Sequence, residues 1–156
     1  MDLMSDLKLV ALDADDLSVI SAHAQDAVLQ VGDMAYLPAE HRFAAIANRF
    51  DWAAATGCQG GPPRMERRRT AMRFDRVLEA KLQGIDLKAK RQVLALLAIQ
   101  FSETDAPGGY ITLVFAGGAA IRLKVECIEA EMRDLGAAWE ARLKPQHPEG
   151  EMASKG

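Results

Sequence analysis

Residues 110–127, YITLVFAGGAAIRLKVEC, contain the strongest local signal in the chain. Two apolar-rich segments flank Gly117 and Gly118, a pattern typical of antiparallel strands joined by a tight turn. Glycine adopts the positive φ angles of such turns at little cost. A two-residue turn would place Val114 opposite Ile121. The sequence therefore predicts a β-hairpin with this register.

The opposite face of the predicted hairpin carries three large apolar side chains, Ile111, Leu113 and Phe115. In the predicted register they lie beside Arg122 and Lys124. Such a face needs cover, which most often comes from the same chain. If it is bare, it predicts a contact with a homodimer mate or another protein at Ile111, Leu113 and Phe115.

Several flanking segments also show strand patterns. Residues 93–101, VLALLAIQF, are apolar on both parities, as in a central strand covered on both faces, with a helix over 91–100 as the alternative. Residues 68–84 alternate with a period of two that only Arg76 interrupts, which predicts one long strand. Further strands are predicted at 7–12, in MAYL (34–37) and in RFAAIANRF (42–50), the last two joined by a turn headed by Pro38.

Two segments have helical spacing. Asp13 is a suitable N-cap for an amphipathic helix over residues 14–24. Near the C-terminus, Ile128, Met132, Leu135 and Trp139 recur at intervals that favour a helix within 128–142, and an extension of the preceding strand is the alternative.

These elements predict an α+β fold dominated by an antiparallel sheet, with an N-terminal and a C-terminal helix. The sheet would form a small barrel or a sandwich, and a layout like that of pleckstrin-homology domains is one candidate. Residues 1–144 would form a single domain, followed by a mobile polar tail over 145–156. Residues 53–65, rich in glycine and proline, would form a long loop.

The composition is that of a soluble globular protein, with 49% hydrophobic and 26% charged residues. The net charge of −3 argues against a protein that coats nucleic acid or membrane as a whole. No apolar run is long enough for a transmembrane helix, and the acidic N-terminus does not resemble a signal peptide. Two cysteines without paired spacing also fit a cytoplasmic protein.

The charge is uneven, because residues 64–77 hold six of the twelve arginines. On a strand, Arg67, Arg69 and Arg73 would share a face with Asp75. This mixing with acids predicts an exposed strand whose arginines form ion pairs. The alternative is a phosphate or nucleic-acid site using Arg64, Arg67, Arg69 and Arg73, but exposed aromatic residues for base stacking are missing.

Catalytic and metal-binding motifs are not apparent. The candidate metal ligands His23, His41, His147, Cys58 and Cys127 lack the close pairs typical of metal sites. Cys58 lies in the glycine-bearing segment TGCQGG, where a thiol could react, and no histidine is near it in sequence. Glu126, Glu129 and Glu131 are interpreted as a solvated face. We therefore expect no cofactor and no metal.

The sequence blocks resemble a known family. LKLVALDADDLSVISAHAQDAVLQVGDMAYLP, RFAAIANRFDW, RRRTAMRFDRV, VFAGGAAIRL and VECIEAEMRDLG are similar to a bacterial family defined as domain of unknown function 2948, over about residues 7–147. This resemblance implies no activity, cofactor or site residue.

Together these patterns favour a non-catalytic, cytoplasmic protein-binding or adaptor module with an unknown protein partner or a homodimer mate. A nucleic-acid or phosphate binder using residues 64–76 is the alternative. An enzyme using Cys58 or clustered carboxylates is a third hypothesis. Binding to nucleic acid or membrane is not expected.

Overall fold

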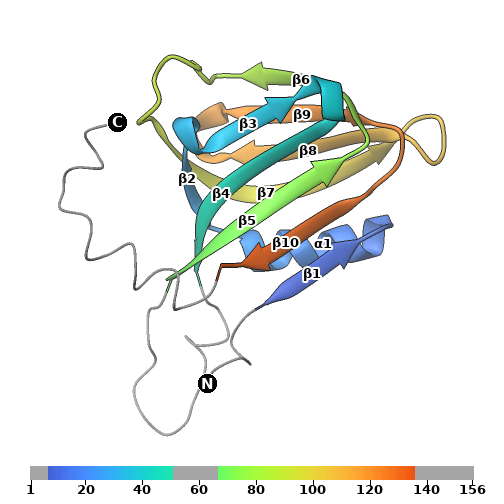
Figure 1. The fold of residues 1–156 in the computed structure, drawn as a ribbon, viewed down its shortest axis with the longest axis horizontal. Helices are drawn as coiled ribbons and strands as arrows, with labels where there is room; N and C mark the ends of the chain where they lie inside the picture. The colour runs from blue at the N-terminus through green and yellow to red at the C-terminus, as the bar shows by residue number, and fades with distance from the viewer. Residues whose placement is uncertain (1–6, 51–66, 136–156) are drawn as a thin grey trace, which may run out of the picture.

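The computed structural model describes residues 7–50 and 67–135. In these residues one helix is combined with ten strands, and three short 3-10 turns connect some of them (Figure 1). In chain order the elements are β1 (Lys8–Ala11), α1 (Ala14–Ala24), β2 (Val28–Gln30), η2 (Val31–Asp33), β3 (Met34–Leu37), η3 (Pro38–Glu40), β4 (Arg42–Phe50), β5 (Arg67–Asp75), β6 (Val77–Gln83), β7 (Val93–Glu103), β8 (Gly109–Phe115), η4 (Ala116–Gly118), β9 (Ala120–Val125) and β10 (Ala130–Asp134).

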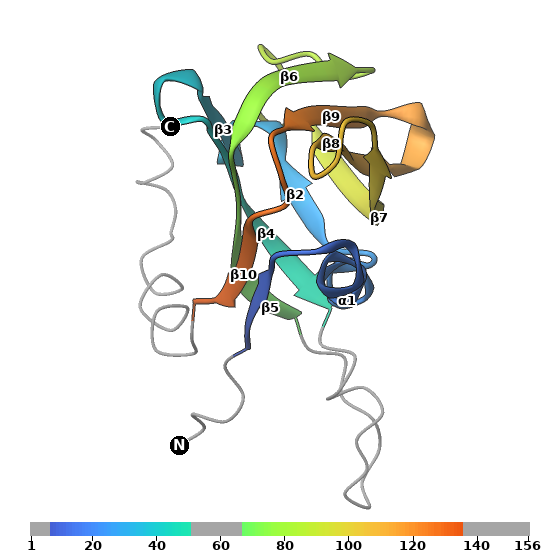
Figure 2. The ribbon, with the colours of Figure 1, turned by 90° about the vertical axis from the view of Figure 1, so that its right-hand side faces the viewer.

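All strand pairs are antiparallel, in the order β1-β10-β5-β4-β2-β7-β8-β9-β6, with β3 also paired to β4. The sheet bends into two facing layers, and β2 links them by pairing with both β4 and β7 (Figure 2). Strands β1 and β6 end the order without pairing to each other, so the described strands do not form a closed barrel. The predicted β-rich antiparallel class is confirmed.

Helix α1 covers one end of the space between the layers, where it packs against β7 and β1 (Figure 2). Its predicted range is confirmed. The backbone N–H of Asp16 donates to the Asp13 side chain at 2.8 Å, which satisfies one of the free donors of the first turn. Leu17 and Ile20 of α1 are buried, and apolar burial of this kind contributes about 1.5–3 kcal/mol per large side chain.

The predicted hairpin is present as β8 and β9, but its predicted register is wrong. The pairs are Leu113 with Ile121 and Val114 with Ala120, one residue away from the prediction. The loop contains three residues, because the Phe115 N–H donates to the Ala119 carbonyl across Ala116–Gly118. Gly117 and Gly118 have φ angles of 83° and 87°, so both glycines serve the turn as expected.

Strand β7 is apolar on both parities because of a β-bulge. Its pairing with β8 shifts between Leu96 and Ala98. Core-facing residues are therefore even-numbered before the shift, as in Leu94 and Leu96, and odd-numbered after it, as in Ile99. Leu97 is 46% exposed, so the expected cover on both faces is not found. The strand itself is confirmed, and the helical alternative is wrong.

The segment 68–84 forms two strands instead of one. Arg76 has a φ of 64° and turns the chain from β5 in one layer into β6 in the other. The core parity changes there, since Met72 and Phe74 are buried before the corner and Val77 after it. The single interruption of the alternating pattern thus marks the corner between the layers.

The predicted helix in 128–142 is wrong over residues 130–134, which form β10 between β1 and β5. Ala130, Met132 and Asp134 share the buried face with a period of two. The strand pattern was hidden because Asp134 is a charged residue on that face. Residues 136–142, the loop at 53–65 and the tail at 145–156 lie outside the described residues. With a strand at 130–134, the C-terminal helix of the pleckstrin-homology layout is not found there.

Candidate functional site

Residues 67–75 of the arginine-rich segment form β5, an interior strand of its layer. It pairs with β4 on one side and β10 on the other, so the expectation of an exposed strand is wrong. The prediction that Arg67, Arg69 and Arg73 share a face with Asp75 is confirmed in β5, because the buried residues Met72 and Phe74 lie on the opposite face. We call the face of β3, β4, β5 and β10 that points away from the core the outer face.

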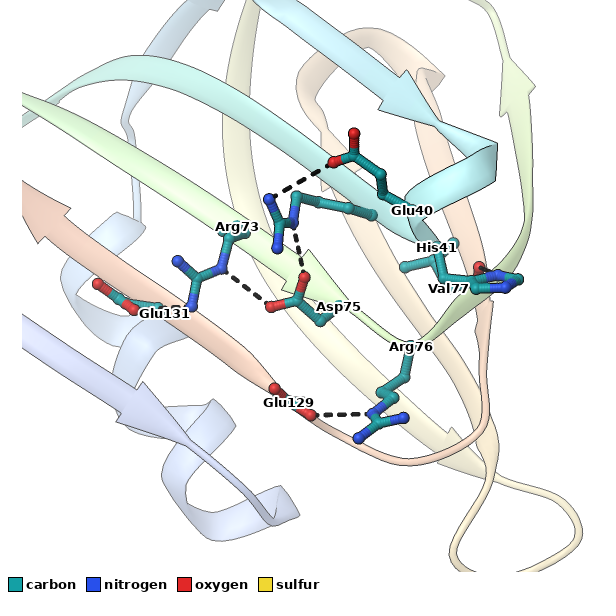
Figure 3. A network of polar contacts seen from close by, with 9 residues as sticks. Glu40, His41, Arg73, Asp75, Arg76, Val77, Glu129 and Glu131 are labelled. Carbon is teal, nitrogen blue, oxygen red and sulfur yellow. Dashed lines mark hydrogen bonds and ion pairs between the residues drawn. The ribbon is translucent and has the colours of Figure 1, made fainter.

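An ion-pair network crosses the outer face over three strands. Asp75 on β5 accepts from Arg42 Nε at 2.8 Å and from Arg73 Nε at 2.9 Å. The Nη2 of Arg73 also donates to Glu131 Oε1 on β10 at 2.9 Å. Figure 3 shows Arg73 between Asp75 and Glu131. The network continues to Arg133, whose Nε lies 3.5 Å from Glu131.

The network controls the ionisation of Asp75. Partial burial alone would raise the pKa of this carboxyl group, but hydrogen bonds from Arg42 and Arg73 lower it to below its usual value. Asp75 is therefore ionised at neutral pH. Its charge is already shared by two guanidinium groups.

At the corner between β5 and β6, Arg76 forms a second set of ion pairs. Its Nε donates to Glu129 at 3.0 Å (Figure 3). Its Nη1 also lies 4.0 Å from Glu126. The hydrogen bond from Arg76 to Glu129 is the main cause that raises the pKa of Arg76. The prediction that arginines of the segment form ion pairs is confirmed for Arg73 and Arg76.

The other arginines of the proposed phosphate site are Arg64, Arg67 and Arg69. The Arg67 guanidinium lies 5.9 Å from the centre of the Phe50 ring, and its Nη1 donates to the Asn48 carbonyl at 3.4 Å. Arg69 stands opposite Asn48 in the pairing of β4 with β5. Arg64 lies outside the described residues. Of these four candidates, Arg73 is the one that the structure places between two acids of the network, Asp75 and Glu131.

Beside the network, the outer face has a groove of about 440 Å³. Its floor is formed by small and apolar side chains of β4 and β5, namely Ala44, Ile46 and Ala71. Strand β3 forms one wall, where Leu37 is 38% exposed. Three arginines and two acids also line it: Arg42, Arg73, Arg133, Asp33 and Glu131. A third acid, Asp75, accepts hydrogen bonds from two of these arginines, Arg42 and Arg73. Sequence reasoning missed this groove, because the alanines that form it give no signal before the strand register is known.

A separate network is buried at the other side of the sheet, on the core face. Asp134 accepts from Arg49 Nε at 2.9 Å, from Arg49 Nη2 at 2.8 Å and from the Thr70 hydroxyl at 2.7 Å. It also accepts from the Leu7 backbone N–H at 3.1 Å. These bonds fasten β4, β5 and β10 together with the start of β1. Because all the partners lie within the chain, we interpret this network as structural.

The sequence contained a signal for the buried pair. Arg49 has the parity of Phe43, Ala45 and Ala47, which are all buried on β4. A charged residue at a core position of a predicted strand requires a buried partner of opposite charge. That requirement could have pointed to an acid such as Asp134.

The predicted partner surface at Ile111, Leu113 and Phe115 is not a surface. These side chains are only 0%, 1% and 2% exposed, because β8 turns them into the core between the layers. The internal cover considered more common for this face is therefore present. Arg122 lies on the other face of β9, over the Tyr110 ring at 4.5 Å from its centre.

The candidate ligands named from the sequence are scattered. The His23 ring forms a hydrogen bond with the Val19 carbonyl of the same helix at 3.0 Å. The His41 ring forms one with the Val77 carbonyl at 3.2 Å. Cys127 is a partly exposed free thiol. Within residues 7–50 and 67–135, no three metal-ligating side chains are grouped, and no helix is long and apolar enough to cross a membrane. Cys58 and His147 lie outside the described residues.

Comparison with known proteins identifies the family. The family described as Protein of unknown function (DUF2948) matches residues 7–147, and the chain belongs to it. No curated protein and no solved structure matches the chain.

Proposed function

We propose that this member of the DUF2948 family is a non-catalytic protein-binding module that binds a segment of a partner protein in the outer-face groove. The observation that carries the proposal is the apolar floor of Ala44, Ile46 and Ala71 directly beside a chain of ion pairs. Most surface sites of this kind combine an apolar centre with a polar rim. The groove offers both.

The size of the groove favours a few side chains of a partner. A volume of about 440 Å³ is comparable with that of small binding sites in other proteins. Small residues on the floor allow an apolar side chain of the partner to approach the sheet closely. Leu37, which is 38% exposed, would gain cover from the same contact.

The charge pattern favours a protein segment over a phosphate group. Arg42 and Arg73 already donate to Asp75 at 2.8 and 2.9 Å, so a phosphate would have to replace existing charge-assisted bonds. The three arginines that line the groove are accompanied by two lining acids, Asp33 and Glu131, and Asp75 accepts from two of the arginines. A partner segment that carries both acidic and basic groups suits this rim better than a polyanion.

The proposal places the protein in the cytoplasm, as the composition and the unpaired cysteines led us to expect.

The alternative functions named from the sequence have less support than the protein-binding function. The nucleic-acid hypothesis depended on cations that would be available to phosphate, and in the described part of the chain Arg73 and Arg76 are engaged by carboxylates. Cys58, on which the enzyme hypothesis depended, lies outside that part.

Site-specific photo-crosslinking tests the proposal. A photoreactive amino acid at position 44 lies in the groove, and one at the exposed position 89 serves as a control. In cells that make the protein, we expect a defined protein adduct at position 44 and none at position 89. The identified partner, once purified, should bind the wild-type chain and the control Ala89→Arg, but not Ala44→Arg. Equal adducts at both positions, or a partner that binds Ala44→Arg normally, would contradict the proposal.

A further inference from the structure

Strand β6 has an open edge. It is the last strand in the sheet order and pairs only with β9, so its other edge faces no strand of the described chain. In Figure 1 it runs along the upper margin of the molecule. An open edge presents backbone donors and acceptors to which another strand can bond. Leu78 and Leu82 on this strand are 43% and 37% exposed.

The sequence of β6 is complementary to itself in the antiparallel direction. Residues 78–82 read Leu-Glu-Ala-Lys-Leu, so the order of apolar residues is the same in reverse and the charges are exchanged. A second copy aligned about Ala80 would place its Lys81 opposite Glu79 and its Glu79 opposite Lys81. The same alignment directs Leu82 towards Leu78 of the second copy, which lies at the β-bulge just before the regular part of the edge. Opposite charges and apolar pairs at such positions stabilise antiparallel strands.

Other symmetric alignments are less favourable. An alignment about Lys81 opposes two lysines, and one about Glu79 opposes two glutamates, which is destabilising. Glu79 and Lys81 now contact each other along the strand at 3.5 Å, and both side chains are about half exposed. They are therefore available to a second copy. Among these three alignments, the charge pattern favours the one about Ala80.

The start of β6 limits the length of the contact. The pairing with β9 shifts between Val77 and Glu79, and the Val77 N–H donates to the His41 carbonyl at 3.0 Å. The open edge is thus regular only from Glu79 to Gln83. A β-bulge and a lysine on an edge strand also discourage pairing with unrelated strands. The contact would be short, which gives a weak and reversible dimer.

We infer that β6 is a homodimerisation edge, through which two copies of this chain join their β6 strands antiparallel about Ala80. This joins the layers containing β6 of the two copies into one continuous sheet. No residue of β6 lines the outer-face groove, so the two proposed contacts use different residues of the chain. Partner binding and self-association can then be tested independently.

Sedimentation of the full chain over a range of concentrations, with charge-exchange variants, tests the inference. The wild type should form a reversible dimer with a Kd below about 1 mM. Glu79→Lys and Lys81→Glu should each raise the dimer Kd by about tenfold or more, because every facing charge pair becomes repulsive. The double variant Glu79→Lys/Lys81→Glu should return the Kd to near that of the wild type. The control Lys88→Glu, on an exposed loop, should leave it unchanged.

Mixing the two single variants gives the sharpest outcome. One carries two lysines and the other two glutamates at positions 79 and 81, so the mixture should form a heterodimer although each variant alone is mainly monomeric. A wild type that is monomeric at about 1 mM overturns the inference. A dimer whose Kd is the same in the wild type and both single variants, or a mixture that stays monomeric, also overturns it.

Discussion

Arg49 and Asp134, 85 residues apart in the chain, form a bidentate ion pair in the interior of the protein. Their side chains are only 5% and 0% exposed. The Thr70 hydroxyl and the Leu7 N–H complete the hydrogen bonds of the carboxylate. The pair joins β4 to β10 through the core face, although β5 lies between these strands. It therefore fixes three strands whose outer face carries the groove.

Removing one member of this pair should be strongly destabilising. Asp134→Ala leaves the Arg49 guanidinium buried without its partner, and we expect a loss of about 3–5 kcal/mol in the free energy of unfolding. Arg49→Met should have an effect of similar size. The double variant Arg49→Met/Asp134→Leu should recover much of the loss, because two apolar side chains replace the charges. Urea unfolding measures all three, and a loss below about 1 kcal/mol in both single variants would contradict this account.

The same pair predicts how stability depends on pH. Burial alone would raise the pKa of Asp134, but the hydrogen bonds from Arg49 and Thr70 outweigh it and lower the pKa below that of the unfolded chain. The resulting stabilisation is fully present above the unfolded carboxyl pKa of about 3.9, and it is lost as the pH falls towards the folded pKa. The wild type should therefore be more stable than Asp134→Asn at pH 7, and the difference should shrink near pH 3. Urea unfolding at several pH values checks this, and a constant difference would contradict it.

The corner at Arg76 should depend on backbone conformation more than on charge. Its φ of 64° is unfavourable for β-branched residues and easy for glycine. We expect Arg76→Val to lower the free energy of unfolding by about 1–3 kcal/mol. Arg76→Gly should stay within about 1 kcal/mol of the wild type, because relief of the backbone offsets the lost exposed ion pairs. If thermal or urea unfolding shows equal losses for both variants, the ion pairs dominate at this corner.

Local patterns predicted the elements better than their pairing. The cap at Asp13 and the apolar spacing predicted α1 correctly, because both signals act within the helix itself. The hairpin register failed by one residue, since Gly117 and Gly118 fit a two-residue or a three-residue loop equally well in sequence. A one-residue difference decided whether Leu113 lies opposite Ile121 or beside it.

The groove depended on information that the sequence carries only indirectly. Ala44 and Ala71 are brought together by the pairing of β4 with β5 across the segment 51–66, and no local pattern specifies that register. The strand at 130–134 was missed for a related reason. Its buried face includes Asp134, whose burial is explained only by Arg49 on a distant strand.

The six arginines of residues 64–77 suggested binding to nucleic acid. Arg73 is held by Asp75 and Glu131 at 2.9 Å each, so its charge is largely compensated before any ligand arrives. Proteins that bind single strands keep cations available along a groove, with aromatic rings for stacking, and their affinity falls steeply with salt. Phe74, the aromatic residue of this segment, is 1% exposed and unavailable for stacking. We therefore expect no micromolar binding of the wild type to single-stranded RNA or DNA in a salt series measured by fluorescence anisotropy. Salt-dependent binding that disappears in Arg67→Glu/Arg69→Glu/Arg73→Glu, with that variant still folded, would show that the outer face of β5 binds phosphate instead.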